Sequence, residues 1–194
     1  MTWLPQGYEV PKSQGNYFKF EKGANKFRVL SAPIMGYVYW NSAGKPVRLK
    51  DFKTMPTDIR LDGEGNPEKI KHFWAFKVWN YKAEKLQILE VTQATIQGAM
   101  QDLVMNEDWG DPQQYDITVS KKGEKLETEY SVTPSPVKPI PENAAHALKT
   151  TSCDLDALFK GGDPFTAAPS SVHNDPDAIY KAFEDAFPDG FEKK

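Results

Sequence analysis

Polar and apolar residues alternate with a period of two through much of the first 133 positions, which predicts a β-rich domain. The alternation starts in NYFKF at Asn16, continues in KFRVLS, and resumes in IMGYVYW after Ala32-Pro33. Proline lacks the backbone N–H that a sheet ladder needs, so this break predicts a bulge or a bend. Together these segments predict one interrupted first strand.

Four further strands are predicted, in KIKHFWAFKVWNY, KLQILEV, YDITVS and LETEYSVT. In the first of them Trp74 and Phe76 share one face with His72 and Val78, and we expect these two rings in the core. The opposite face alternates lysines with rings, namely Lys71, Phe73, Lys77, Trp79 and Tyr81. The loop KKGEK between the last two strands offers a glycine for a positive φ angle.

Residues 92–105 change to the helical period. Ile96, Ala99, Met100, Leu103 and Val104 form one apolar stripe. Thr92 is a candidate N-cap. A helix is therefore expected between the third and fourth main strands.

Two long polar regions divide the chain further. Residues 41–69 form a long, partly basic connection with at most one short strand at 46–50. Residues 134–141, PSPVKPIP, indicate a proline-rich linker. The predicted domains are an irregular lead-in (1–15), a main domain (16–133), the linker (134–141) and an acidic tail with short helices (142–194).

The order strand, loop, strand, strand, helix, strand, strand is that of the OB-fold. The predicted fold class is therefore mainly β: a five-stranded OB-fold Greek-key barrel with one helix between strands three and four. A partly helical or disordered acidic C-terminal tail follows it. We expect the tail beyond Thr151 to be dispensable for folding and to compete with a ligand for the basic surface.

Charge is distributed unevenly along the chain. Residues 1–85 carry 15 Lys and Arg against 8 Asp and Glu, whereas residues 86–194 carry 9 against 19. Fifteen of the 24 aromatic residues also lie in the first 85 positions. Basic and aromatic residues together suggest nucleic-acid contact at one end and an acidic, partner-directed segment at the other.

OB-folds bind oligonucleotides on strands two and three and on the adjoining loops. Single strands are held by cations along the phosphates and by rings that stack on bases. The candidate nucleic-acid-binding residues are Arg28, Tyr37, Tyr39, Lys45, Arg48, Lys50, Lys53, Arg60, Lys71, Phe73, Lys77, Trp79, Tyr81, Lys121 and Lys122. Which rings face the ligand depends on the strand register, since a slip of one residue exchanges the two faces.

Three segments carry a family resemblance: GNYFKFEKGANKFRVLSAPIMGYVYW, HFWAFKVWNY and DWGDPQQYDITVSKKGEKLETEYSVTP. They resemble tailed-phage single-stranded DNA-binding proteins of the helix-destabilising type. The resemblance covers about residues 15–140 and implies an OB-fold core, sequence-independent binding, and a tail that recruits replication and recombination enzymes. Some relatives hold a structural zinc, but one cysteine and three scattered histidines do not supply that site here.

No catalytic or phosphate-loop motif occurs in the sequence, so we expect a non-enzymatic protein without metal or cofactor. The predicted function is to coat and protect single-stranded DNA in the cytoplasm during replication, recombination or repair, away from any membrane. Ile179, Phe183 and Phe187, spaced four apart, are the predicted partner-binding stripe of the tail. The alternative is a protein–protein adaptor or inhibitor on the same barrel, with its acidic half mimicking nucleic acid.

Overall fold

The structure, a computed structural model, describes residues 15–166. It is mainly β, as predicted, and its seven strands form one antiparallel sheet. The strands are β1 (Gly23–Val29), β2 (Ile34–Trp40), β3 (Pro46–Leu49), β4 (Lys71–Asn80), β5 (Lys85–Val91), β6 (Asp116–Lys122) and β7 (Glu129–Pro134).

Strand β4 organises the sheet because it pairs with three other strands. One of its edges pairs with β5 from Trp74 to Asn80. The other edge pairs first with β2, where Ala75 opposes Ile34, and then with β1, where Asn80 opposes Phe27. The predicted interruption at Ala32-Pro33 therefore splits one long strand into β1 and β2. Strand β1 also pairs with β6 and β6 with β7, while β2 pairs with β3.

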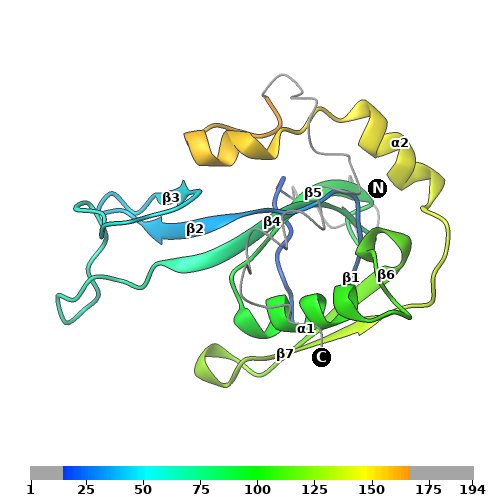
Figure 1. Ribbon diagram of the computed structural model, residues 1–194, viewed down its shortest axis with the longest axis horizontal. Coiled ribbons are helices and arrows are strands. Elements are labelled where there is room, and N and C mark those ends of the chain that lie inside the picture. The colour runs from blue at the N-terminus through cyan, green and yellow to red at the C-terminus, as the bar shows by residue number, and fades with distance from the viewer. Residues whose placement is uncertain (1–14, 167–194) are drawn as a thin grey trace, which may run out of the picture.

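The predicted barrel closure is wrong for the described residues, because β5 and β7 do not pair and the sheet stays open. Helix α1 (Ala94–Met105) runs beside β7 (Figure 1) and buries Ile96 and Met100 in the core. Side chains of the helix, rather than another strand pairing, thus cover this opening.

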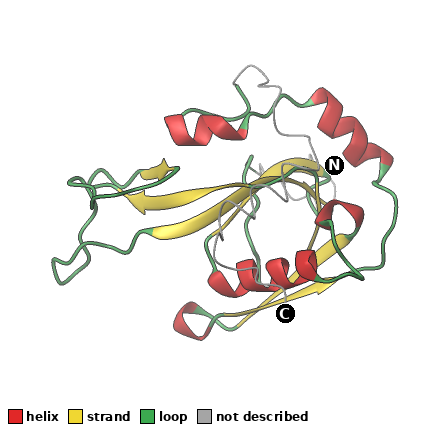
Figure 2. Ribbon diagram, viewed as in Figure 1, coloured by secondary structure: helices red, strands yellow, loops and turns green. Residues whose placement is uncertain are grey.

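Hydrophobic clusters pack on both faces of the sheet. Figure 2 shows α1 on one side of the long strands and α2 (Glu142–Thr150) with the short 3₁₀ helix η3 (Leu155–Lys160) on the other. The first cluster, on the α1 side, includes Phe27, Val29, Trp74, Phe76, Val78, Ile96, Met100, Ile117 and Val119, which confirms Trp74 and Phe76 as core residues. The second includes Leu30, Ile34, Phe73, Trp79, Ile88, Ala144, Cys153, Leu155 and Leu158. Strand β4 is consequently buried on both faces.

The segment 142–166, assigned above to the tail, packs on the sheet. Its few apolar residues fall on one side, so Ala144, Leu155 and Leu158 are at most 2% exposed despite the polar composition. The linker is also held, because the Ser135 N–H donates to the Asp116 carbonyl at 2.8 Å and the Lys138 N–H to that of Gln114 at 3.1 Å. Residues 152–166 thus pack with the sheet, which argues against the expectation that everything beyond Thr151 is dispensable for folding.

Two local predictions shift by a few residues. Helix α1 begins at Ala94 with Gln93 as N-cap and no side-chain cap bond, so Thr92 does not cap it. Strand β7 begins at Glu129 rather than Leu126, because Lys125–Glu127 form a 3₁₀ turn, η2. The hairpin glycine behaves as predicted, since Gly123 has a φ of 71°.

A buried carboxylate, Asp116 on β6, joins four parts of the chain. Its Oδ1 accepts hydrogen bonds from Arg28 Nε and from the Tyr81 hydroxyl, both at 2.7 Å. Lys26 Nζ lies 3.1 Å and Lys138 Nζ 2.6 Å from its Oδ2. Arg28, fully buried like Asp116, also donates to the carbonyls of Gln113 and Lys138.

These contacts govern the charge of Asp116. Burial raises the pKa of a carboxyl, but the hydrogen bonds from Lys138, Tyr81, Arg28 and Lys26 outweigh it and hold the pKa of Asp116 at about 2. Desolvation and the bond to Asp116 raise the pKa of Tyr81, so its hydroxyl stays protonated and donates.

We predict that Asp116→Asn lowers the free energy of unfolding at neutral pH by about 3–5 kcal/mol, because it leaves Arg28 buried without its counter-charge. The folded-state pKa lies below the unfolded value, so the contribution is present above about pH 4 and is lost as the pH falls toward 2. Urea titrations across that range should show this acid loss in the unaltered chain and in the control Asp102→Asn, an exposed α1 carboxylate, but less of it in Asp116→Asn. Equal stability of the two variants would contradict the assignment.

We predict that Leu158→Ala lowers the free energy of unfolding by about 2–5 kcal/mol, because Leu158 is 2% exposed in the second cluster. The exposed neighbour Lys160→Ala should have almost no effect. Thermal melts of both variants test whether residues 152–166 belong to the folded body. If Leu158→Ala were as stable as the control, residues 152–166 would not contribute to the stability of the folded domain.

Candidate nucleic-acid interface

One open groove of about 700 Å³ lies where the sheet leaves the cover of α2 and η3. We call it the first groove. The residues of its wall that bear on binding are Tyr17, Lys19, Trp40, Arg48, Arg60, Glu68, Lys69, Lys71 and Glu90. They come from the lead-in to β1, the β2–β3 hairpin, the loop before β4, and the adjoining ends of β4 and β5.

The sheet register explains why three of these elements meet. Val38 on β2 pairs with Lys71 on β4 and with Arg48 on β3, so these three side chains stand in one row on one face. This is the face that also carries Phe73 and Ala75, two and four positions after Lys71. The first groove is therefore the uncovered end of the face that the alternation of lysines and rings predicted.

The loop between β3 and β4 folds back against β2 and completes the wall. The Arg60 N–H donates to the Trp40 carbonyl at 2.8 Å, and the Glu68 N–H donates to the Arg60 carbonyl at 2.9 Å. In Figure 1 this loop and the β2–β3 hairpin extend together away from the rest of the molecule. Backbone pairing thus sets Arg60, Glu68 and Trp40 side by side.

Two exposed rings line the first groove. Trp40 is 44% exposed, and the Arg60 guanidinium lies 5.3 Å from its ring centroid. Tyr17 is 38% exposed, and its backbone bridges to Ile88 of β5. Partial burial raises the pKa of Tyr17, so the ring adds no negative charge at neutral pH. Both rings are therefore partly accessible to a flat ligand.

The cations of the first groove fall into two kinds. Arg48 Nε donates to Glu90 at 2.6 Å, and Arg60 makes a two-pronged pair with Glu68 at 2.8 Å for each bond. Within the described region, Lys19, Lys69 and Lys71 form no ion pair, and all three are exposed. The arginines are oriented by carboxylates, and the three lysines carry the excess positive charge.

The structure overturns four of the predicted contacts. Arg28, Tyr39, Phe73 and Trp79 are at most 6% exposed. Arg28 pairs with Asp116, and the Tyr39 hydroxyl donates to Asp58 at 2.9 Å. Phe73 and Trp79 do lie on the predicted face, but the second cluster covers them. A base has no access to these side chains.

The other predicted residues are spread over the molecule. Arg48, Arg60 and Lys71 line the first groove, whereas Tyr81 lies at the Asp116 cluster. Tyr37 is half-buried between Phe52 and His72, and Lys50 pairs with Asp156 while lying over the Phe159 ring. Lys77 is half-buried. Four further lysines lie outside both the first groove and the Asp116 cluster, namely Lys45, Lys53, Lys121 and Lys122. The tail stripe Ile179, Phe183 and Phe187 falls outside the described residues.

The sequence-based selection missed Tyr17, Lys19, Trp40 and Lys69. The alternation in NYFKF was visible and places Tyr17 and Lys19 opposite Phe18 and Phe20, which pack on the first cluster. Trp40 is the last residue of a predicted strand and Lys69 the last residue of a predicted loop, and at such ends the periodicity does not assign a residue to either face. Only the pairing of the folded chain brings the four together.

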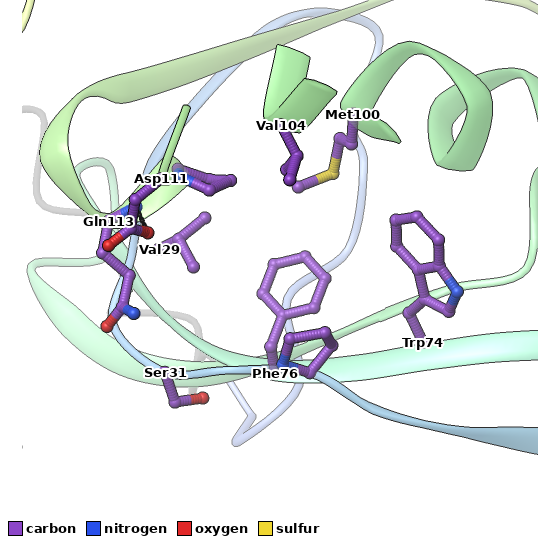
Figure 3. Close-up of a pocket in the computed structure, with 10 residues that line it drawn as sticks. Val29, Ser31, Trp74, Phe76, Met100, Val104, Asp111 and Gln113 are labelled. Carbon is purple, nitrogen blue, oxygen red and sulfur yellow. Dashed lines mark hydrogen bonds between the residues drawn. The ribbon is translucent and has the colours of Figure 1, made fainter. Parts of the chain in front are cut away.

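A second, smaller cavity of about 30 Å³ lies between the sheet and α1. Figure 3 shows Trp74, Phe76, Met100 and Val104 around it, with Asp111 and Gln113 at its rim. Its volume suits about one water molecule rather than a nucleotide.

Within residues 15–166 no group of three His, Cys, Asp or Glu side chains is placed to hold a metal ion. Nor does any described helix have the length and apolarity needed to span a membrane.

Comparisons with known proteins give one point of reference. No family model matches the chain, and no solved structure matches it significantly. A protein of Escherichia phage T5 named "Probable ssDNA-binding protein" is 25% identical over 138 residues, covering 60% of this chain and 53% of that protein. The chain thus spans about half the length of the curated relative that it matches.

Proposed function

We propose that this chain binds single-stranded DNA without sequence preference and that the strand lies in the first groove. The observation that carries the proposal is the meeting of two exposed rings, Trp40 and Tyr17, with three lysines that form no ion pair within the described residues. The name of the T5 relative supports the same ligand.

The chemistry of the groove suits a flexible, unpaired strand. Every base has a π-face, so stacking on Trp40 and Tyr17 would contribute about 1–3 kcal/mol per base whatever the sequence. Lysine acts as a mobile point charge, which follows a phosphate backbone without fixed geometry. Arg48 and Arg60, already paired with Glu90 and Glu68, serve to hold the wall in place and to support the Trp40 ring.

The strand arrangement supports an OB-type fold as part of this proposal. With β1 and β2 taken as one interrupted strand, the pairs first–second, second–third, first–fourth and fourth–fifth match a Greek-key barrel that lacks its closing third–fifth pair, with α1 after the third strand. OB-folds are partly open, and they bind oligonucleotides at strands two and three and the neighbouring loops. The first groove occupies the corresponding place.

In this proposal the protein has no catalytic activity and coats single strands during replication, recombination or repair in the host cytoplasm. It would then be a phage protein of the helix-destabilising type. The acidic C-terminal region, with Ile179, Phe183 and Phe187, would recruit partner proteins by presenting an apolar stripe. The excess of acidic residues after position 85 supports that division of labour.

We predict that Trp40→Ala weakens binding of labelled oligo(dT) by about 1–3 kcal/mol with little change in thermal stability, because the ring is exposed. Trp79→Ala is the matched comparison: it should destabilise the fold by about 3–5 kcal/mol, because Trp79 is 4% exposed. Fluorescence anisotropy and thermal melts separate the two effects. Unchanged affinity in Trp40→Ala would show that Trp40 does not stack on a base. If the unaltered chain bound no oligo(dT), the proposed function would be wrong.

We also predict that Lys69→Gln with Lys71→Gln reduces the slope of log K against log salt by about 1.4, because each neutralised phosphate accounts for about 0.7 of that slope. The control is Lys149→Gln with Lys160→Gln, which removes the same charge from exposed sites outside the groove. Oligo(dT) titrations at several salt concentrations provide the slopes. Equal slopes in both double variants would show a general charge effect instead of binding in the groove.

A further inference from the structure

A second open groove of about 740 Å³ lies on the other side of the lead-in to β1. We call it the second groove. Its wall includes Lys19, Lys22, Lys26, Tyr81 and Lys82. Three of its lining residues, Tyr17, Phe18 and Lys19, also line the first groove. The two grooves therefore flank one short segment of chain.

That shared segment is fixed to the sheet. The Phe18 N–H donates to the Ile88 carbonyl at 2.8 Å, and the Ile88 N–H donates to the Asn16 carbonyl at 2.9 Å. The Phe18 ring is buried edge-on against Phe20 and Phe27. Tyr17 and Lys19, which alternate with these rings, remain at the surface between the grooves.

The second groove is basic. It has four lysines in its wall against one carboxylate, Glu21, which pairs with Lys82. Lys22 lies 3.5 Å from Glu124, with both side chains more than 70% exposed. Exposed pairs of this kind contribute little and exchange readily, so these ammonium groups stay available to a phosphate.

The Asp116 cluster, to which Lys26 of the groove wall belongs, extends the positive charge at one end of the second groove. Arg28, Lys26 and Lys138 surround a single carboxylate, which leaves two positive charges uncompensated. Lys26 and Lys138 are 45% and 42% exposed, and their ammonium groups lie 4.9 and 5.7 Å from the Tyr81 ring centroid. The Tyr81 hydroxyl is held by Asp116, so the ring and both lysines have fixed positions. This is a preorganised place for an anionic group.

We propose that the second groove is an additional binding site for the phosphate backbone of the same single strand, which passes from the first groove over Tyr17 and Lys19. The inference rests on the proposed function and extends it: the path has two basic sections joined by the shared segment. A short strand fills one section, and only a longer strand engages both.

The test measures how affinity grows with strand length, using the full chain and oligo(dT) of about 4 and about 16 nucleotides, the range known for small single-strand-binding folds. The variant is Lys22→Gln with Lys26→Gln and Lys82→Gln. It should bind the long strand roughly tenfold to a hundredfold more weakly at about 0.1 M salt, with a salt slope lower by about 2. Its affinity for the short strand should stay close to that of the unaltered chain.

Two comparisons isolate the effect. Lys122→Gln with Lys125→Gln and Lys149→Gln removes the same charge from exposed sites outside both grooves and should leave the gain with length intact. Lys22→Gln with Lys82→Gln spares Asp116 and should show about two thirds of the loss on a logarithmic scale, even if the triple variant folds poorly. The second groove is not a binding site if affinity rises with strand length as much in this double variant as in the unaltered chain. The same conclusion follows if the control variant loses as much affinity for the long strand. Absence of any binding by the unaltered chain overturns the proposed function and this inference with it.

Discussion

The buried pair of Arg28 and Asp116 is the constraint on which the rest of this fold depends. Both side chains have no exposed surface, and a buried charge left alone would cost several kcal/mol. The pair is tolerated because Tyr81, Lys26 and Lys138 complete it. It therefore fastens β1 to β6 and brings the end of β4 and the segment after β7 to the same point. Arg28 also binds the carbonyl of Lys138, which fixes the path of residues 134–141.

That path determines which surface remains for a ligand. Once residues 134–141 are held at the Asp116 cluster, α2 and η3 come to lie over the face of β4 opposite α1 (Figure 1). Phe73 and Trp79 then serve as core residues. The accessible part of this face shrinks to its end beside the β2–β3 hairpin, where Trp40, Lys71 and the folded-back loop form the first groove.

The basic residues of the chain consequently do two different jobs. Arg28, Arg48 and Arg60 are paired with carboxylates and hold elements together. Arginine suits this task because its planar fork binds a carboxylate with fixed geometry. Lys19, Lys69 and Lys71 stay exposed around the exposed rings, and the lysines of the second groove surround Tyr81 and the shared segment. A net excess of positive charge in the first half of the sequence conceals this division.

The sequence by itself determined the elements and one side of the core. Period-two alternation located the strands, the stripe Ile96/Met100 located α1, and Pro33 marked the break between β1 and β2, because each signal is local. Trp74 and Phe76 were assigned correctly for the same reason. The sequence also indicated that one end of the chain is basic and aromatic.

Only the tertiary structure decided what packs against the strand faces that the sequence did not assign to the core. Lysines alternating with Phe73 and Trp79 are compatible with a ligand surface or with a cover from elsewhere in the chain, and the cover comes from residues more than 60 positions away. Whether β5 pairs with β7 likewise depends on segments that are distant in the sequence. The same is true of the meeting of Tyr17, Trp40 and Lys69 in the first groove. Periodicity reports which residues share a face, but burial depends on what packs against that face, and that is a property of the whole fold.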